Sequence, residues 1–153
     1  MIPLERGQLW VMHIHALTIG ALALAAGLLG EAIVRDNVDL PPGIVTIPLL
    51  VLLLYPVLVA PGRRYRAWGY AMDADELRIA RGVWTRIETI VPLARVQHVD
   101  VSQGPIERTF GVCRLVLHTA GTMHSRVVLP GLARATAEAL RDEVRGRIVQ
   151  DAL

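Results

Sequence analysis

The distribution of apolar residues divides this chain into two parts. Residues 9–34 form an apolar run of 26 residues with one carboxylate, Glu31, near its end. As a helix this run is roughly 39 Å long, enough to cross a hydrocarbon core of about 30 Å with some tilt. Residues 44–60 form a second run, roughly 26 Å long as a helix, at the short end of the spanning range. The pattern predicts two transmembrane helices joined by the link "RDNVDLPPG".

A cleaved signal peptide is the competing interpretation of the first run. Such a peptide has a basic leading segment and a shorter apolar core. Here only Glu5 and Arg6 precede the run, and a second span follows closely, so we expect a retained hairpin. Pro48 and Pro56 lie inside the second span, where neighbouring helices can satisfy the carbonyls that they leave without a donor.

Basic residues near the span ends predict the orientation of the hairpin. Arg63, Arg64 and Arg66 follow the second span directly, whereas the inter-span link carries only Arg35 among acidic residues. Because cytoplasmic flanks are enriched in Lys and Arg, we expect both termini to be cytoplasmic. The same three arginines, with Trp10 at the start of the first span, are candidate contacts for lipid headgroups; the alternative is that the arginines only set topology.

Beyond Tyr65 the apolar residues alternate with polar ones, in short runs separated by turn residues. The alternating sets are Trp68/Tyr70/Met72, Leu77/Ile79, Ile87/Thr89/Val91 and Val99/Val101. This period of two predicts an antiparallel meander. Two further runs predict a hairpin across Gly121-Thr122, which gives six or seven strands and leaves no room for a parallel crossover.

The last segment changes to a helical period. Its apolar positions are Leu132, Ala135/Thr136, Ala139/Leu140, Val144 and Ile148, with Arg134–Glu138 and Glu143–Arg147 as i,i+4 ion pairs on the polar face. The fold class is therefore a membrane protein of the α+β type. We expect a transmembrane hairpin in residues 1–62, then a bent antiparallel sheet or partial barrel capped by a C-terminal helix in residues 63–153.

Composition and charge agree with this division. The chain is 53% hydrophobic, too apolar for one ordinary soluble domain. Its net charge is −2 over residues 1–62 and +4 over residues 63–153. Cys113 is the only cysteine, which excludes an intramolecular disulfide, and we expect it to be a small buried apolar residue. The modest positive charge argues against nucleic-acid binding.

These features together resemble the bacterial pleckstrin-homology (PH) membrane proteins, over nearly the whole chain. The positions that carry the resemblance are Trp68, Tyr70, Gly82, Pro92, Arg95, Gln97, Gln103, Arg108, Phe110 and Gly111. The resemblance implies a PH-like domain behind two transmembrane helices, in the bacterial inner membrane. It implies no particular activity, because most members of the family have none assigned. Eukaryotic PH domains bind phosphoinositides through a basic first loop, and here the corresponding segment "MDADE" is acidic, so we do not expect that property.

No pattern in the chain indicates an enzyme. There is no glycine-rich phosphate loop, no nucleophile elbow and no helical metal-binding pair, so we expect no catalytic residue, cofactor, metal ligand or small-molecule substrate. His13 and His15 lie within the first span, where ionisable residues are often functional. Two residues apart on a helix, they point in different directions, which favours interfacial anchoring over a proton or metal site shared with a partner.

Five small residues fall on one face of the first span: Ala16, Gly20, Ala23, Gly27 and Gly30. Small residues let helices approach closely in membranes. This face either packs against the chain's own second span or contacts another subunit. Phe110 is expected to plug the sheet domain, while Arg108 pairs with Glu107 or another acid; the alternative is that Arg108 and Phe110 form a partner-binding edge, and the role of Arg108 stays open. We therefore expect a non-catalytic scaffold in the lipid bilayer, which forms a homo-oligomer or pairs with a related PH-domain membrane protein. The alternative is an anionic-lipid or envelope-stress module that uses the arginines.

Overall fold

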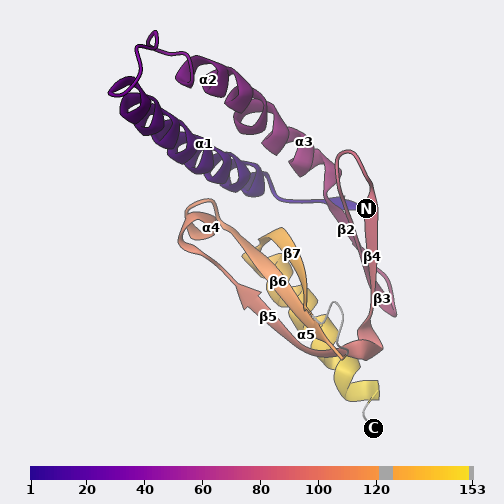
Figure 1. Ribbon diagram of the computed structural model, residues 1–153. Helices are drawn as coiled ribbons and strands as arrows, with labels where there is room; N and C mark the ends of the chain where they lie inside the picture. The colour runs from indigo at the N-terminus through magenta and orange to yellow at the C-terminus, as the bar shows by residue number, and fades with distance from the viewer. Residues whose placement is uncertain (121–125, 152–153) are drawn as a thin grey trace. The chain divides into compact units, whose positions relative to one another are not determined.

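The computed structural model describes residues 1–120 and 126–151, with side chains described up to residue 147. The chain forms two compact units (Figure 1). The hairpin unit is Met12–Arg63, and the sheet unit is Met1–Val11 together with Arg64–Leu153. The first eleven residues therefore belong to the sheet unit rather than to the hairpin, where the sequence analysis had placed them.

The hairpin consists of two long helical runs. The first is α1 (Arg6–Arg35). The second is continuous from α2 (Thr46–Leu54) through a π-helical turn (Tyr55–Val59) into α3 (Ala60–Ala67). Pro56 lies in the π-helical turn, where the wider turn accommodates a residue without a backbone N–H. The second run thus extends past the expected end at residue 60 and includes the three arginines.

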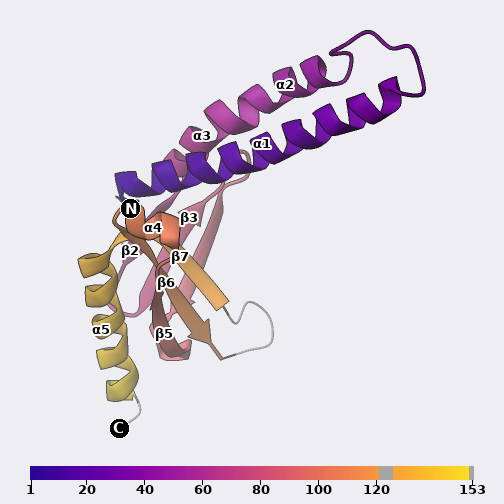
Figure 2. The ribbon, with the colours of Figure 1, turned by 90° about the vertical axis from the view of Figure 1, so that its left-hand side faces the viewer.

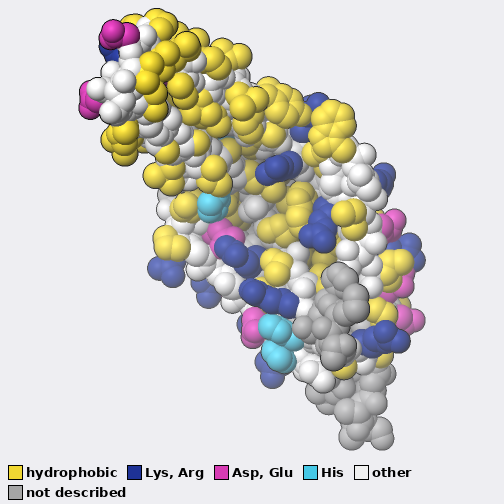
Figure 3. Space-filling model, viewed as in Figure 1, with side chains coloured by type: hydrophobic (Ala, Val, Ile, Leu, Met, Phe, Trp, Pro, Cys, Tyr) yellow, Lys and Arg dark blue, Asp and Glu magenta, His cyan; other side chains and the backbone are white. Residues whose placement is uncertain are grey.

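Both helical runs are long and apolar enough to cross a membrane, and they leave their apolar side chains exposed. Only 11% of the most hydropathic window of the first run is buried, and 6% of that of the second. A core helix of a soluble protein would be mostly buried. Figure 3 shows hydrophobic side chains covering one side of the hairpin. The helices therefore have the surface that a bilayer requires.

Glu31 holds the closed end of the hairpin. Its carboxylate accepts hydrogen bonds from the backbone N–H of Gly43, from that of Val45 at 3.2 Å, and from that of Thr46 at 2.8 Å. It also accepts one from the Thr46 hydroxyl at 2.7 Å. These donors lie just before α2 and at its first residue, and the N-cap residue Val45 has no capping side chain. Glu31 therefore caps α2 from the neighbouring helix, and this satisfies an acidic group that is only 7% exposed.

The sheet unit contains seven strands among the described residues, in two antiparallel sheets. Sheet A has the order β1-β2-β3-β4 and sheet B the order β5-β6-β7. The strands are β1 (Ile2–Pro3), β2 (Gly69–Met72), β3 (Glu76–Arg81), β4 (Ile87–Pro92), β5 (Val96–Ser102), β6 (Val112–Thr119) and β7 (Arg126–Ala133). The predicted α+β class is confirmed, as an open pair of sheets rather than a closed barrel. The predicted turn at Gly121-Thr122 lies outside the described residues.

The core of the sheet unit lies between the strands and the last helix, α5 (Arg134–Asp151). Leu77, Leu115, Leu117 and Leu129 are fully buried there. Figure 2 shows α5 beside the strands of sheet B, and its residues contact β5 most extensively. The buried residues of this core come from both sheets, so the two sheets pack as one unit.

The predicted apolar stripe of α5 is only partly correct. Leu140 and Val144 are buried as expected, but Ala135 and Ala139 are exposed and Ala137 is buried instead. The prediction also placed Leu132 on the helix, but β7 continues to Ala133 and the helix begins at Arg134, so Leu132 is a buried strand residue. Residues 137, 140 and 144 form the buried face of the helix. The side chain of residue 148 lies outside the described set. Both predicted ion pairs are present, at 2.9 Å for Arg134–Glu138 and 4.0 Å for Glu143–Arg147.

Candidate functional sites

The three arginines expected to contact headgroups lie on α3. Arg63, Arg64 and Arg66 are all exposed there. Arg63 Nη1 donates a hydrogen bond at 3.4 Å to the hydroxyl of Tyr55, about two helical turns earlier in the same run. The arginines therefore form an exposed cationic collar on a continuous helix. This arrangement fits either a topology signal or a contact with anionic lipid.

Arg66 also lines a basic hollow in the sheet unit. The hollow has a volume of about 320 Å³, and its lining includes Arg66, Arg86, Trp68 and Gly82. The guanidinium of Arg81 lies over the Trp68 ring at 6.0 Å from its centroid, within cation–π range. Gly82 has φ +104 in the β3–β4 turn, and a Cβ there would collide with the carbonyl of Thr85. Two of the positions that carry the family resemblance, Trp68 and Gly82, thus shape one hollow with two arginines on its wall.

The segment from Gln103 to Gly111 folds around a short helix, α4 (Pro105–Thr109). Glu107 is only 4% exposed and accepts a hydrogen bond from the Gly104 N–H at 2.6 Å. Its partner is Arg114, at 2.8 Å, and not the neighbouring Arg108, which is exposed. Gln103 donates from Nε2 to the Val112 carbonyl at 2.9 Å. Gln103 therefore holds this turn, while Arg108 remains on the surface.

Phe110 does not plug the core. It is half-buried, lies outside the buried cluster and stacks on Trp10, with ring centroids 6.5 Å apart and planes inclined by 14°. The plug interpretation failed because the core is filled by leucine and valine from both sheets. Phe110 instead lies against the start of α1, where a Cβ at Gly7 would collide with the Phe110 carbonyl. Trp10, expected at the membrane interface, is 59% exposed.

The remaining positions of the resemblance serve the fold in several ways. Pro92 ends β4, Arg95 ends a 3-10 turn (Leu93–Arg95), and Gln97 occupies an irregularity in the pairing of β5 with β6. Gly111 has φ +67, which favours glycine. Tyr70 is buried, and burial raises the pKa of its phenol. We find no chemistry that joins these residues into one site.

Cys113 is 1% exposed, as predicted. Burial raises the pKa of its thiol, with Glu107 adding to the effect. The thiol lies 3.4 Å from the Leu132 carbonyl. It is therefore a small packed group rather than a reactive one.

The small-residue face of α1 is turned in part toward the second helical run. A Cβ at Gly20 would lie 2.7 Å from the Val57 side chain, and one at Gly27 would collide with Leu49. Ala16 and Ala23 are half-buried, whereas Gly30 is exposed and has nothing within 4 Å of a Cβ. Of the two alternatives, Gly20 and Gly27 fit packing within the hairpin, and a contact between subunits stays a prediction.

A set of chemically notable residues was missed by the sequence analysis. His98, Asp100 and His118 bring their side-chain nitrogen and oxygen atoms within 4.8 Å of one another. His98 and Asp100 are close in sequence, but His118 joins them only through the pairing of β5 with β6. The sequence did contain a signal for this group: "HVD" places His98 and Asp100 on one face of a predicted strand, and a further histidine, His118, ends the next predicted strand. By contrast, His13 and His15 belong to no such group among the residues that the structure describes.

Sheet A ends in a strand with exposed apolar side chains. In the part of the chain that the structure describes, β4 is one of the two outer strands of that sheet, the other being the short β1. Ile87 is 46% exposed, Ile90 is 52% exposed, and Trp84, in the turn before the strand, is 84% exposed. An outer strand with apolar side chains is a surface on which another chain can pair.

Comparisons with known proteins agree on the family. A family model described as "Bacterial PH domain" matches residues 14–148. The chain is 36% identical over 88 residues to the UPF0699 transmembrane protein YdbS of Bacillus subtilis, covering 58% of this chain and 54% of that protein. It is 26% identical over 82 residues to YdbT of the same organism, covering 53% of this chain and 17% of that protein. The chain thus spans about half the length of YdbS, and no solved structure matches it.

Proposed function

Because this chain belongs to the bacterial PH-domain family of membrane proteins, we propose that it is a non-catalytic, membrane-anchored scaffold that associates through its sheet unit. The partner is a second copy of the chain or a related PH-domain membrane protein. The two spans fix the sheet unit to the bacterial inner membrane, and the arginine collar favours a cytoplasmic sheet unit.

The observation that carries this proposal is the apolar outer strand β4. Ile90 on one face of the strand, Ile87 on the other and Trp84 in the preceding turn all expose apolar area. One edge of this strand has no strand partner among the described residues. Strand addition supplies backbone hydrogen bonds, and alternate side chains give specificity. The small-residue face of α1 supports the proposal less, because Gly20 and Gly27 already contact the second helical run.

The test is the mass of the full-length protein in neutral detergent, measured by light scattering. We expect a defined oligomer that Ile90→Ser converts to monomer. Glu88→Ser is the matched control, an exposed residue on the same strand and the same side, and should leave the mass unchanged. Gly30→Leu adds bulk on α1 without touching the second helix. Loss of the oligomer in that variant alone would place the contact in the hairpin.

A wild-type monomer would contradict self-association. The protein would then be mixed with a related PH-domain membrane protein in the same detergent. Complex formation that Ile90→Ser abolishes would support pairing with a relative. If no complex forms with the relative either, the scaffold proposal is wrong.

A second candidate function is recognition of an anionic lipid headgroup, favoured by the basic hollow. Arg66 and Arg86 line it, and Trp68 forms part of its wall. The relevant measurement is tryptophan fluorescence of the protein in neutral detergent during titration with a short-chain anionic lipid. Saturable binding that weakens with salt and in Arg66→Gln/Arg86→Gln, but not in the exposed control Arg145→Gln, would support it. Equal response to a zwitterionic lipid would contradict it.

A further inference from the structure

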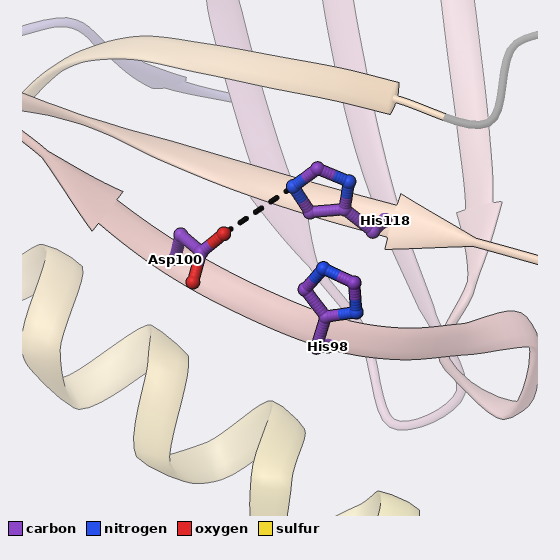
Figure 4. Close-up of side chains that lie close together, drawn as sticks. All are labelled: His98, Asp100 and His118. Atoms are coloured by element: carbon purple, nitrogen blue, oxygen red, sulfur yellow. Dashed lines mark ion pairs between the residues drawn. The ribbon is translucent and has the colours of Figure 1, made fainter.

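Two histidines and an aspartate meet on the solvent side of sheet B. His98 and Asp100 are two residues apart on β5, so both side chains leave the same face of the strand. His118 on β6 is the direct cross-strand partner of His98. Figure 4 shows the three side chains gathered between the two strands. Val99, between His98 and Asp100, points to the opposite face and is buried in the core.

The distances within this cluster suit a shared cation. His118 Nε2 lies 3.3 Å from Asp100 Oδ2. The imidazoles of His98 and His118 stack with centroids 4.2 Å apart and planes inclined by 17°. Each residue offers one ligand atom, and these atoms all lie within 4.8 Å of one another. Two ligands at about 2.1 Å from a tetrahedral metal are about 3.4 Å apart, so the His118–Asp100 separation already fits. Binding one ion with all three groups requires His98 to move its ring nitrogen closer to the other two ligand atoms.

The fold does not require this cluster. His98 and Asp100 are exposed and His118 is half-exposed, so the three side chains contribute no core packing. A His–Asp pair at a surface adds little to stability. The adjacent strands nevertheless hold the three groups in a fixed register, as a binding site on regular structure requires.

We propose that His98, Asp100 and His118 form a three-ligand site for a divalent first-row transition-metal ion, of which Zn²⁺ is the representative. Two imidazole nitrogens and one carboxylate oxygen are a donor set that such ions accept, whereas Mg²⁺ and Ca²⁺ prefer oxygen donors alone. Solvent supplies any further ligand, since the face is exposed. The bound ion bridges β5 and β6. This site is independent of the proposed scaffold role.

One neighbouring charge opposes the cation. Arg126 on β7 is the cross-strand partner of His118 on its other side, and partners of this kind share a face of the sheet. The guanidinium therefore weakens binding by repulsion. Arg126→Gln should tighten it, which is an effect that non-specific association of metal with scattered histidines does not predict.

The test is calorimetric titration of Zn²⁺ into the full-length protein in neutral detergent, purified without a histidine tag. We expect one ion per chain. His98→Ala, His118→Ala and Asp100→Asn should each weaken binding by at least about tenfold, since even residues that only support a ligand are worth that much. The control His13→Gln/His15→Gln removes two imidazoles from the hairpin run and should bind as wild type does.

The result that would overturn the proposal is no saturable binding by the wild type, or binding that the three variants leave unchanged. Circular dichroism of each variant separates loss of a ligand from loss of the fold. Asp100→Asn is the mildest change at an exposed position, so it keeps the test decisive if an alanine variant unfolds. A titration with Mg²⁺ should show no binding, and equal affinity for Mg²⁺ would also overturn the proposal.

Discussion

The hairpin and the sheet unit use the same aliphatic residues in opposite ways. In the hairpin, Leu22 is 72% exposed and Leu52 is 72% exposed. In the sheet unit, Leu77, Leu115 and Leu117 are fully buried. In water, the hydrophobic effect favours burial of apolar side chains in a core. The interior of a bilayer is itself apolar, so apolar side chains that face lipid gain little from burial.

The difference also explains where each unit puts its polar groups. In the hairpin, backbone groups are satisfied within the helices, and the one buried carboxylate, Glu31, caps a helix start. In the sheet unit, the buried carboxylate of Glu107 instead pairs with Arg114 and with a backbone N–H. Each unit buries an acid only where donors surround it, as the high cost of an unpaired buried charge requires.

The largest expected effect on stability comes from truncating a buried leucine of the sheet unit, compared with an exposed leucine of the hairpin. Leu115→Ala should lower the free energy of unfolding of the sheet unit by about 2–5 kcal/mol, because it removes packed methyl groups and leaves a cavity. Leu22→Ala, in the hairpin, should change it by less than about 0.5 kcal/mol. Denaturant unfolding in detergent, followed by tryptophan fluorescence, measures this, since Trp10, Trp68 and Trp84 all belong to the sheet unit. Equal effects would contradict the contrast between the units.

A smaller effect is expected from the cap of the hairpin. Glu31→Ala should destabilise the helical hairpin by about 1–3 kcal/mol, because it leaves backbone donors at the start of α2 without an acceptor. Thr46→Val removes only the hydroxyl donor and should cost about 0.5–1.5 kcal/mol. Thermal scans by far-UV circular dichroism in detergent report helix loss. If Thr46→Val proved as damaging as Glu31→Ala, the capping role would be wrong.

The smallest effect concerns alkaline pH and the sheet unit alone. Burial raises the pKa of Cys113 above its ordinary value of 9.0. The native state therefore retains a proton that the unfolded chain releases, and stability falls as pH rises above that value. The slope from one group is at most about 1.4 kcal/mol per pH unit. Cys113→Ala should flatten the alkaline decline of unfolding free energy, and an unchanged pH profile would contradict this assignment.

Several elements were predictable because they depend on local patterns. The spans, the strands from β2 to β7 and the last helix follow from apolar periodicity and turn residues, and the structure contains them all. The start of α5 was not predictable, because it depends on where β7 ends: Leu132, expected on the helix, lies on the strand. β1 was missed because a strand of two residues has no periodicity and pairs with β2, far along the chain.

The sequence by itself determined the division into an apolar hairpin and an alternating domain, since composition and period are properties of each segment alone. Only the tertiary structure decided which side chains meet. Glu31 reaches α2, Trp10 stacks on Phe110, and His118 joins His98 and Asp100 because helix packing and strand register bring distant residues together. Such contacts depend on the sum of many weak interactions across the fold, which no single segment encodes.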